Sequence, residues 1–546
     1  MTKIKILVAD NDSDYRKSLA ENVLKMEGYE VFQAGNPQEA KEILKKELIH
    51  LAILDIRLKN DDDSSDESGF ELSKEIDPGV AWIVLTGYPP DWVKTEAFRE
   101  KFRITFADSS VELHIVNKSE GPKAVLKAVK KTLEEKFEVI PRRRIAVLTS
   151  GGDSPGMNAA IRAIVCIAMD NDVEVIGIQD GYKGLVNNLM RRLTWKEVSD
   201  IHLYGGTILG TARFPEFEKP DIREKAVKNI IDKHITGLVV IGGDGSMKGA
   251  EVLAKDLESH EREFHTIAIP GTIDNDIWGT DMSLGTASAA TAMIEELRNI
   301  LHPAQALRRI FLCEVMGRYC GYLALQAALG IGADAVILPE DVVVIDPPRS
   351  ENDLKPWQER WNGIETEKKF LSRIEEIAKL LKITFSKDKR YGFVVLSEGV
   401  KLLSKKQLKI ERVQETLENA LTQWNLPDLP ELRTHIMGHV VRGVAPCRYD
   451  LWLGARLGTA AVQCILNGKS EVMVGWSEGY GGDVNGKKPG IIETKFDVAL
   501  EKSNRPPHEI WQDRPKWQEL LEMHEALACP PELRDKLRER GNRFVQ

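Results

Sequence analysis

The sequence predicts an α/β protein in which parallel β-sheets, covered by helices, form more than one domain. Short apolar runs alternate with stretches of helical apolar spacing along most of the chain. Because neighbouring parallel strands require a crossover connection, this alternation indicates parallel sheets with right-handed crossovers. At 546 residues the chain is also too long for one ordinary hydrophobic core, so two to four domains are expected.

Composition argues against several kinds of partner and location. The chain is 42% hydrophobic and 29% charged, as is typical of soluble globular proteins. Its formal net charge of −9 gives no reason to expect a nucleic-acid or membrane-surface partner. The six cysteines lack zinc-site or disulfide-framework spacing, which indicates reduced thiols in a cytoplasmic protein. No apolar run reaches membrane-spanning length, and the N-terminus does not have the pattern of a signal peptide.

The first 136 residues predict five strands that alternate with helices. The expected strands are 3–9, 29–34, 51–54, 81–85 and 113–116, with helices at 37–47 and 124–136 among those between and after them. Four strands lead into residues that suit a phosphorylatable carboxylate site: Asp10, Asp55, Thr86 and Lys118. An acid cluster can hold Mg²⁺ beside one such carboxylate, while a hydroxyl and an ammonium interact with the phosphoryl charge.

This pattern resembles the response-regulator receiver domain, which has a flavodoxin-like fold. The resemblance implies that Asp55 is the phosphoacceptor, Asp10 belongs to the metal-binding cluster, Thr86 is the switch hydroxyl and Lys118 senses the phosphate. Asn11 stands where the family has a second acid, and the loop at 60–67 is unusually acidic. Two interpretations stay open: a receiver phosphorylated by a histidine kinase, and a degenerate receiver that docks without switching.

A basic run at 141–144 separates this module from the rest of the chain. Pro141 interrupts the preceding helical spacing, and three arginines follow it. A solvated linker is the simplest interpretation of such a run. We therefore expect a receiver-like domain at 1–136, a linker at 137–143, a second module at 144–480 and a C-terminal extension at 481–546. The sequence of the extension and of the polar segment at 341–392 predicts helices, among them 517–528. It does not indicate a function for either segment.

Two glycine-rich turns follow buried strands of the second module. The strand at 145–148 leads into 149–158 and a helix at 159–168, and the strand at 238–241 leads into 242–246. Glycine lets backbone N–H groups approach a polyphosphate, and the helix that follows directs its positive end toward it. Arg213 and Phe214 offer a guanidinium and an aromatic ring that suit a nucleotide phosphate and a base.

A third turn, at 270–276, carries two carboxylates after the strand at 266–269. Asp274 and Asp276 lie two residues apart, which in an extended stretch places them on one face. One could accept a proton from a substrate hydroxyl while the other helps to hold a metal ion. The alternative for this turn alone is that Asp and Asn simply close it.

Together these motifs resemble 6-phosphofructokinase over about residues 143–480. They are Gly-Gly-Asp-Ser-Pro-Gly-Met-Asn at 151–158, Gly-Gly-Asp-Gly-Ser at 242–246, Pro-Gly-Thr-Ile-Asp-Asn-Asp at 270–276 and Glu-Val-Met-Gly-Arg at 314–318. The resemblance implies a phosphofructokinase fold of two α/β domains with the active site in the cleft between them, usually in a homotetramer. It implies transfer of the γ-phosphoryl of MgATP to the 1-hydroxyl of fructose 6-phosphate, giving fructose 1,6-bisphosphate and ADP in glycolysis.

The resemblance also assigns roles to residues. Asp274 would be the general base, Asp244 and Asp276 would serve Mg²⁺, and Thr272 and Arg318 would stabilise the transferring phosphoryl. The ATP site would comprise Gly152, Arg213, Phe214, Asp244, Gly245, Ser246 and Gly249. The sugar phosphate would be bound by Thr272, Asp274, Asp276, Arg309, Met316, Gly317, Arg318, Glu398, Arg433, His439 and Arg442. The family pattern places Arg309 and Arg433 in the site of a neighbouring subunit.

Two glycines favour ATP as the phosphoryl donor. In this family an acid in place of Gly245 and a lysine in place of Gly271 accompany the use of pyrophosphate. Glycine at both positions leaves room for the longer triphosphate. The alternatives are a non-catalytic sugar-phosphate sensor, a pyrophosphate-dependent enzyme, and a kinase of the same fold that acts on another sugar phosphate.

Overall fold

The structure is a computed structural model. In it the chain forms two compact units. The first comprises Met1–Arg144 with Asp172–Glu174 and Asp232–His234, and the second comprises the rest. The structure describes residues 4–47, 49–60, 66–73, 76, 80–87, 114–136, 143–260, 264–346, 360–386, 389–402, 410–423, 430–479, 489–506, 509 and 514–528. The expected linker lies outside the described residues except for its last one, Arg143.

The described strands of the first unit form a parallel sheet in the order β2-β1-β3-β4-β5. This is the order of doubly wound flavodoxin-like folds, so the predicted fold class is confirmed. Its strands are β1 (Lys5–Ala9), β2 (Glu30–Ala34), β3 (Leu51–Asp55), β4 (Ala81–Thr86) and β5 (His114–Asn117). The helices within its described residues include α1 (Ser13–Leu19), which continues as η1 (Ala20–Leu24), then α2 (Pro37–Lys46), α3 (Ser68–Ser73) and α6 (Pro122–Lys136).

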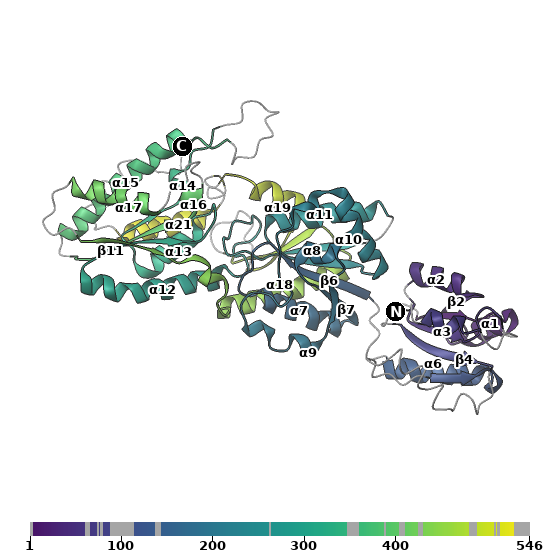
Figure 1. Ribbon diagram of the computed structural model, residues 1–546. Coiled ribbons are helices and arrows are strands. Elements are labelled where there is room, and N and C mark those ends of the chain that lie inside the picture. The colour runs from purple at the N-terminus through teal and green to yellow at the C-terminus, as the bar shows by residue number, and fades with distance from the viewer. Residues whose placement is uncertain are drawn as a thin grey trace. The chain divides into compact units, whose positions relative to one another are not determined.

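The burial of β1 shows why this sheet needs helices on both faces. Ile6 and Val8 belong to one core cluster, which they share with α1, η1 and α6. Leu7 and Ala9 belong to another, which they share with α2 and α3. Successive side chains of a strand point to opposite faces, so an apolar run without alternation is buried on both sides. Figure 1 shows helices on both sides of this sheet.

The second unit contains a larger sheet in the order β16-β15-β10-β9-β6-β7-β8. Its inner strands run parallel, whereas the edge pairs β15–β16 and β7–β8 are antiparallel. The strands are β6 (Arg143–Ser150), β7 (Val173–Ile178), β8 (Met190–Leu193), β9 (Gly237–Gly242), β10 (His265–Pro270), β15 (Val472–Ser477) and β16 (Gly490–Lys495). Helices that cover it include α7 (Met157–Asp170), α8 (Gly181–Val186), α10 (Pro220–Asp232), α11 (Asp244–Glu258), α18 (Arg448–Leu466) and α19 (Phe496–Ser503).

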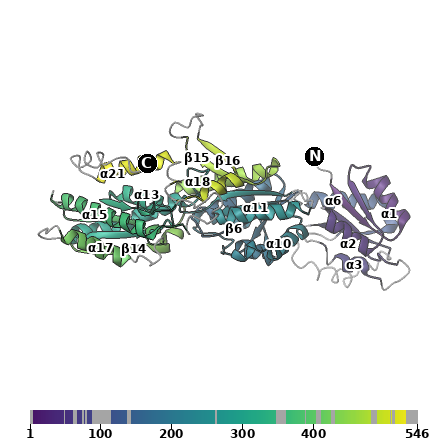
Figure 2. The ribbon, with the colours of Figure 1, turned by 90° about the horizontal axis from the view of Figure 1, so that it is seen from above.

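Between β10 and β15 the chain builds a second parallel sheet, in the order β12-β13-β11-β14. Its strands are β11 (Ile310–Val315), β12 (Ala335–Ile337), β13 (Gly392–Ser397) and β14 (Leu432–Ile436). It packs with α12 (Thr286–Leu307), α13 (Tyr322–Ile331), α15 (Gly363–Ser386), α17 (Ile410–Thr422) and α21 (Pro515–Ala528). Figures 1 and 2 show helices on both faces of this sheet.

Two segments without a predicted function have clear packing roles. Helix α15 lies in the polar segment at 341–392 and buries Phe370, Ile374, Ile377 and Leu381 against the smaller sheet. Helix α21 lies in the C-terminal extension and buries Trp517 and Leu521 in the core shared with α13. Within the described residues no helix combines the length and the apolar character needed to cross a bilayer.

Candidate active site

Three strand ends of the larger sheet meet at one edge. In the ladder register Ser150 of β6 and Pro270 of β10 both pair with Gly242, the last residue of β9 between them. The loops at 151–156, 243 and 271–276 therefore start from neighbouring points at the carboxyl ends of parallel strands. This is the edge at which open α/β sheets bind their ligands.

The first loop leads into α7 through a strained glycine. Gly156 has φ 101° in the left-handed region, and a Cβ there would lie 2.9 Å from Leu284 Cδ1. Both the backbone conformation and the space therefore require glycine. The helix begins at Met157, two residues before the predicted start. Helix α11 begins at Asp244, so two helix N-termini and their N–H groups lie at this edge, which favours anions.

Asn275 determines the shape of the carboxylate turn. Its conformation shows that the expected extended backbone between Asp274 and Asp276 was wrong. Its φ of 55° lies in the left-handed region, so Asp274 and Asp276 are not alternate residues of an extended stretch. Asn275 is fully buried, and its Oδ1 accepts hydrogen bonds from Ser283 N at 2.7 Å and Ser283 Oγ at 3.0 Å. Its Nδ2 donates to the carbonyl of Asp281 at 3.1 Å. The strained residue is thus fixed by its own side chain.

Within the carboxylate turn, the side chain of Asp274 is buried, and one of its oxygens has no hydrogen-bond partner among the described residues. Asp274 is 6% exposed, and this oxygen is Oδ1. Its N–H donates to Thr272 Oγ1 at 3.2 Å. Burial and the charge of Asp276 raise the pKa of Asp274 to about 7, against the lowering effects of Arg442 and Arg318. Such a carboxyl can accept a proton near neutral pH.

Asp276 connects this turn to the second loop. Burial and the charge of Asp244 raise the pKa of Asp276 to about 6, and Arg318 and Arg514 oppose this rise. Asp276 is thus repelled by Asp244 and in turn repels Asp274, and a cation beside Asp276 would relieve this repulsion. No group of three or more His, Cys, Asp or Glu side chains in the described part of the chain is arranged to hold a metal ion alone.

The predicted nucleotide residues differ in their packing. No described atom lies within 4 Å of a Cβ built on Gly245, whereas one on Gly249 would lie 2.7 Å from Tyr182 Cε2. Tyr182 Oη donates to the carbonyl of Ser246 at 2.6 Å, so Gly249 permits a packing contact that supports this helix start. Gly245 instead faces open space.

The other predicted nucleotide residues lie near the first loop. Thr211 Oγ1 donates to the carbonyl of Gly151 at 2.9 Å, which ties the segment before Arg213 and Phe214 to this loop. Arg213 is exposed and Phe214 is half-buried against the core of the larger sheet. A Cβ on Gly152 would lie 2.8 Å from Arg442 Nη1, and the same nitrogen donates to the carbonyl of Asp153 at 3.0 Å. A predicted sugar-phosphate cation therefore contacts the predicted nucleotide loop.

Among the predicted sugar-binding residues, Glu398 supports the loop at 316–318. Its Oε1 accepts hydrogen bonds from the N–H groups of Gly317 at 3.2 Å and Arg318 at 2.9 Å. Arg318 has φ 49°, so this loop also contains a strained residue. Met316 is 8% exposed and packs in the same core as Ile273, the residue before Asp274. The loop and the carboxylate turn are thus supported by one core.

Two other predicted sugar-binding residues, Arg309 and Arg433, lie near the start of β11, at the opposite end of this strand from the loop at 316–318. Arg309 precedes β11 and Arg318 follows it, and a strand of six residues spans roughly 20 Å. Arg309 Nε is 2.7 Å from Glu431 Oε2, and Arg433 also pairs with Glu431. His439 is exposed. The placement of Arg309 and Arg433 fits their predicted role in the site of a neighbouring subunit, whereas His439 lies in η6 (Gly438–Arg442), the element that also carries Arg442.

Sequence reasoning missed Asp450 and Arg514. Asp450 of α18 is fully buried and accepts hydrogen bonds from Gly285 N at 2.8 Å, Ser288 N at 2.7 Å and Ser288 Oγ at 2.5 Å. It thereby fixes the start of α12, which follows the carboxylate segment. Arg514 Nη2 donates to the carbonyl of Ile277 at 2.5 Å. These partners are far apart in sequence, so no local pattern could have identified them.

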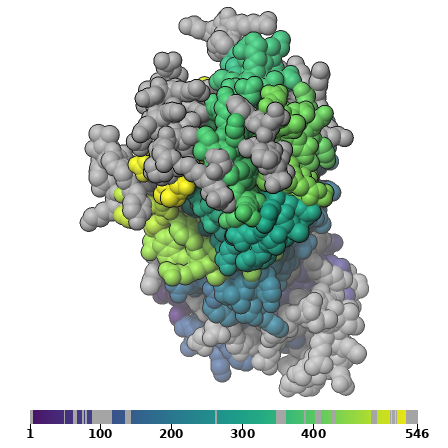
Figure 3. Space-filling view, turned by 90° about the vertical axis from the view of Figure 1, so that its left-hand side faces the viewer, coloured from purple at the N-terminus to yellow at the C-terminus, as the bar shows by residue number. Residues whose placement is uncertain are grey.

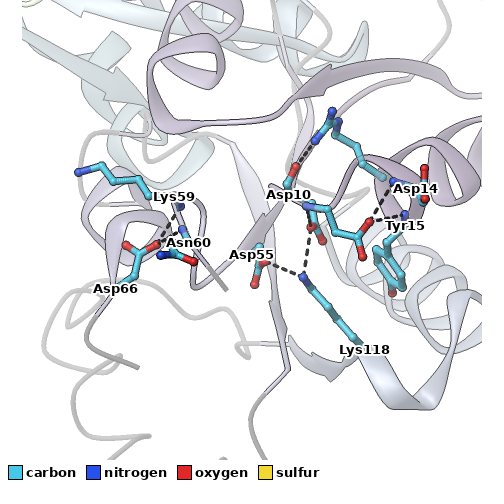
Figure 4. A network of polar contacts seen from close by, with 10 residues as sticks. Asp10, Asp14, Tyr15, Asp55, Lys59, Asn60, Asp66 and Lys118 are labelled. Atoms are coloured by element: carbon cyan, nitrogen blue, oxygen red, sulfur yellow. Dashed lines mark hydrogen bonds and ion pairs between the residues drawn. The ribbon is translucent and has the colours of Figure 1, made fainter. Parts of the chain in front are cut away.

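The first unit has its own cluster of charged residues at the ends of β1, β3 and β5 (Figure 4). Lys118 Nζ is 2.6 Å from Asp55 Oδ2 and 3.1 Å from Asp10 Oδ1, and both acids are buried. Burial lowers the pKa of Lys118, but these two acids outweigh it and raise the pKa. Thr86 is fully buried at the end of β4.

Asn11 and the acidic loop complete this region. Asn11 Oδ1 is buried with no hydrogen-bond partner among the described residues. Most of the acidic loop, residues 61–65, lies outside the described residues. Asp66 Oδ2 accepts hydrogen bonds from the N–H groups of Lys59 at 2.8 Å and Asn60 at 2.9 Å.

The parallel sheets covered by helices define, first, an α/β protein whose strand-end loops carry paired carboxylates. Comparison with known proteins is more specific. The phosphofructokinase family model matches residues 144–465, more than half of the chain. The chain therefore belongs to the phosphofructokinase family.

Individual relatives agree with this assignment. The chain is 38% identical over 364 residues to an ATP-dependent 6-phosphofructokinase of Staphylococcus carnosus (strain TM300), covering 66% of this chain and 95% of the relative. It is 35% identical over 376 residues to one of Yersinia enterocolitica, covering 68% and 98% respectively. The solved structure of phosphofructokinase from Saccharomyces cerevisiae superposes with a TM-score of 0.57 at 29% identity, covering 70% of this chain and 50% of that one.

Proposed function

We propose that this chain is an ATP-dependent 6-phosphofructokinase, which transfers the γ-phosphoryl of ATP to the 1-hydroxyl of fructose 6-phosphate. The products are fructose 1,6-bisphosphate and ADP. The observation that carries the proposal is the buried Asp274, whose Oδ1 has no described hydrogen-bond partner at an edge where three strand-end loops meet. Relatives named as ATP-dependent 6-phosphofructokinases, at 35–38% identity, support the same activity.

In this proposal Asp274 is the general base. Its carboxylate accepts the proton of the sugar 1-hydroxyl as that oxygen forms its bond to the γ-phosphorus and the bond from phosphorus to the bridging oxygen of ADP breaks. A pKa of about 7 suits this role, because the base is then substantially ionised at neutral pH yet basic enough to hold the proton. The burial that raises the pKa also excludes water from the reacting oxygen.

Asp244 and Asp276 fit a Mg²⁺ site shared with the donor phosphates. Mg²⁺ is commonly held by one or two carboxylates together with substrate phosphates and water, so a site of two carboxylates is sufficient. The repulsion that raises the pKa of Asp276 indicates a site in need of positive charge. When bound, Mg²⁺ would neutralise charge on the phosphates and help to orient them.

The remaining groups position charge around the moving phosphoryl. The N–H groups at the starts of α7 and α11 and the Thr272 hydroxyl are suited to the phosphoryl oxygens, which carry most of the transition-state charge. Arg318, held by the contact of its N–H with Glu398, supplies a guanidinium close enough to influence both Asp274 and Asp276. Arg442 is assigned to the sugar 6-phosphate.

Packing around two glycines supports ATP over pyrophosphate. Open space at Gly245 can accommodate the additional part of a nucleotide. A Cβ on Gly271 would lie 2.9 Å from Ile241 Cγ2, so a lysine there would require the core to move. A donor panel of ATP and pyrophosphate, with Mg²⁺ and fructose 6-phosphate, tests this choice. Turnover with pyrophosphate alone would overturn it.

A sugar-phosphate sensor of the same fold is the alternative to be excluded. Calorimetric binding of fructose 6-phosphate together with a coupled assay for ADP distinguishes the two functions. A kinase should bind fructose 6-phosphate and release one ADP for each sugar phosphate consumed. Binding without ADP release under every condition would favour the sensor.

For the first unit, we propose a receiver domain with Asp55 as phosphoacceptor. The contact of Lys118 with Asp55 and Asp10 supports this second function, because an ammonium so placed can bind a phosphoryl group on Asp55. Transfer from a histidine kinase would add negative charge and alter these contacts. Incubation of the full chain with acetyl phosphate should label the wild type and leave Asp55→Asn unlabelled. Labelling of both would exclude Asp55.

We further propose that Arg309 and Arg433 complete the site of a neighbouring subunit in a homo-oligomer. Their separation from their own chain's Arg318 supports the assignment. Mixing inactive Arg433→Ala with inactive Asp274→Asn subunits tests it, because mixed assemblies contain some intact sites. Light scattering should show an oligomer, and mixing should restore part of the activity. A monomer with full activity would refute the proposal.

A further inference from the structure

The C-terminal extension contacts the chain directly after the carboxylate turn. Ile277 and Trp278 are the two residues that follow Asp276. Trp278 N donates to Ser503 Oγ at 2.8 Å, and the ammonium of Lys502 lies 3.9 Å from the centre of the Trp278 ring. Arg514 Nη2 donates to the carbonyl of Ile277 at 2.5 Å. The end of α19 and the residue directly before α21 therefore both contact this point.

Arg514 is itself held in place by the core of the smaller sheet. Its guanidinium lies 4.3 Å from the centre of the Trp517 ring, and Trp517 is 3% exposed. The Trp517 ring packs 4.8 Å from that of Tyr322, in the core that also contains Ile273. The same core thus supports the residue before Asp274 and the ring that orients Arg514. In Figure 3 the yellow atoms of the described C-terminal region lie beside the teal and green atoms of the segments that form the smaller sheet and its helices.

The charge of Arg514 matches its surroundings. Asp276 and Asp281 both interact electrostatically with its guanidinium, while burial opposes the charge and lowers the pKa of Arg514. Asp281 also anchors the segment on the other side, since its Oδ2 accepts from Glu478 N at 2.8 Å and its own N–H donates to the carbonyl of Trp476 at 2.8 Å. A planar guanidinium can donate to a carbonyl and stack on a ring at the same time, which an ammonium does less well.

We infer that the C-terminal extension, through Arg514, positions the carboxylate turn for phosphoryl transfer. Arg514 fixes the carbonyl of Ile277 from outside the turn and places a positive charge beside Asp276. The left-handed Asn275 and the hydrogen bonds to Ser283 fix the turn from inside. The inference rests on the proposed function for its effect on catalysis. The positioning itself is a property of the fold and can be measured separately.

Steady-state kinetics of Arg514→Met, Arg514→Lys and Arg505→Met in the full chain test the catalytic part. Arg505 is the matched control, because it is a half-buried arginine of the same extension whose Nε donates to the carbonyl of Lys502. Displacement of a catalytic group by about 1 Å can cost roughly 100-fold in rate. We expect Arg514→Met to lower kcat by about 10- to 100-fold with KM for fructose 6-phosphate within about 3-fold, because positioning acts on the chemical step.

The conservative variant separates positioning from general support of the fold. Arg514→Lys keeps a charge and a donor and should recover part of kcat, and Arg505→Met should match the wild type. A kcat for Arg514→Met equal to that of Arg505→Met would overturn the inference. Equal loss of kcat in the Lys and Met variants together with a large fall in unfolding temperature would also overturn it, since the residue would then only support the fold.

Hydrogen exchange provides a readout that does not depend on activity. Amides at 272–281 should exchange faster in Arg514→Met than in Arg505→Met, while amides of α11 stay unchanged. If the wild type shows no turnover, the proposed kinase function fails, and this local change still decides the positioning. Unchanged exchange at 272–281, or faster exchange throughout the second unit, contradicts the inference.

Discussion

Replacement of Asp274 by asparagine should lower kcat strongly and stabilise the protein at the same time. A general base of this kind contributes about 10²- to 10⁴-fold to the rate, so kcat of Asp274→Asn should fall by at least ~100-fold. The stability effect follows from the raised pKa. Burial and the charge of Asp276 raise the pKa of Asp274 from its ordinary value of 3.8 to about 7, which corresponds to on the order of 4 kcal/mol lost when the folded protein carries the ionised carboxylate.

The sign of the stability effect depends on pH. Because the pKa of Asp274 is higher in the folded than in the unfolded state, the folded state binds more protons between about pH 4 and 7. Stability therefore falls as pH rises through this range and levels off above about pH 7. Asparagine carries no charge, so it avoids this loss of stability. Its buried amide also needs hydrogen-bond partners, and an unsatisfied amide would cost about 1–3 kcal/mol. We expect a net gain of about 1–3 kcal/mol at pH 8 and less at pH 5.

Thermal unfolding at pH 5 and pH 8, together with the coupled ADP assay, measures both effects. Asp334→Asn is the matched control, because Asp334 is also a buried acid but binds Lys389 Nζ at 2.5 Å and Phe393 N at 2.9 Å. The control should lose stability and keep kcat. Activity of Asp274→Asn within tenfold of the wild type would refute the base assignment. A lower unfolding temperature at pH 8 would refute the account of its burial.

Four further outcomes are expected. In the wild type, kcat/KM for fructose 6-phosphate should rise about tenfold per pH unit below about pH 7 and then level off, as the base ionises; a profile flat from pH 5 to 8 would contradict this. Gly245→Asp should raise KM for ATP by at least about tenfold, since like charges 4 Å apart repel by about 1–4 kcal/mol, with no change in unfolding temperature because its Cβ meets open space. Asp450→Asn should lower stability by about 1–3 kcal/mol, measured by denaturant unfolding, because the amide cannot accept all the hydrogen bonds that the buried carboxylate accepts. Asp55→Asn should make the kinetics insensitive to acetyl phosphate; a response equal to that of the wild type would exclude a switch at this residue.

Local sequence features predicted most of the strands and the loops that follow them. Continuous apolar runs such as 145–148 and 238–241 have no alternation, which is the pattern of strands buried on both faces, and both are central in the larger sheet. Because those strands run parallel, their carboxyl ends meet at one edge. The meeting of the three loops at that edge was therefore predictable without any contact information.

The geometry within the turn was not predictable in the same way. Asp274 and Asp276 were expected to share a face through extended backbone, whereas Asn275 adopts a left-handed conformation. Asparagine tolerates that region, but the decisive contacts come from Ser283, eight residues away. A local pattern indicates that a turn exists, and tertiary hydrogen bonds determine which turn it is.

Long-range partners were the second limit. Arg514 binds the carbonyl of Ile277, 237 residues earlier, and Asp450 binds the start of α12, about 160 residues earlier. Both residues lie in segments whose sequence predicts ordinary helices or loops. Only the packing of those segments on the two sheets brings their charges to the site. The C-terminal extension had no predicted function for this reason.

The most direct test of the account is ³¹P NMR of the full chain incubated with ATP, Mg²⁺ and fructose 6-phosphate, beside the same mixture with Asp274→Asn. We predict that the wild type produces ADP and a second phosphate ester, on carbon 1 of the sugar, and that the variant leaves both substrates unchanged over the same period. Formation of the bisphosphate by the variant at the wild-type rate, or sugar-phosphate binding by the wild type without product, would contradict the account.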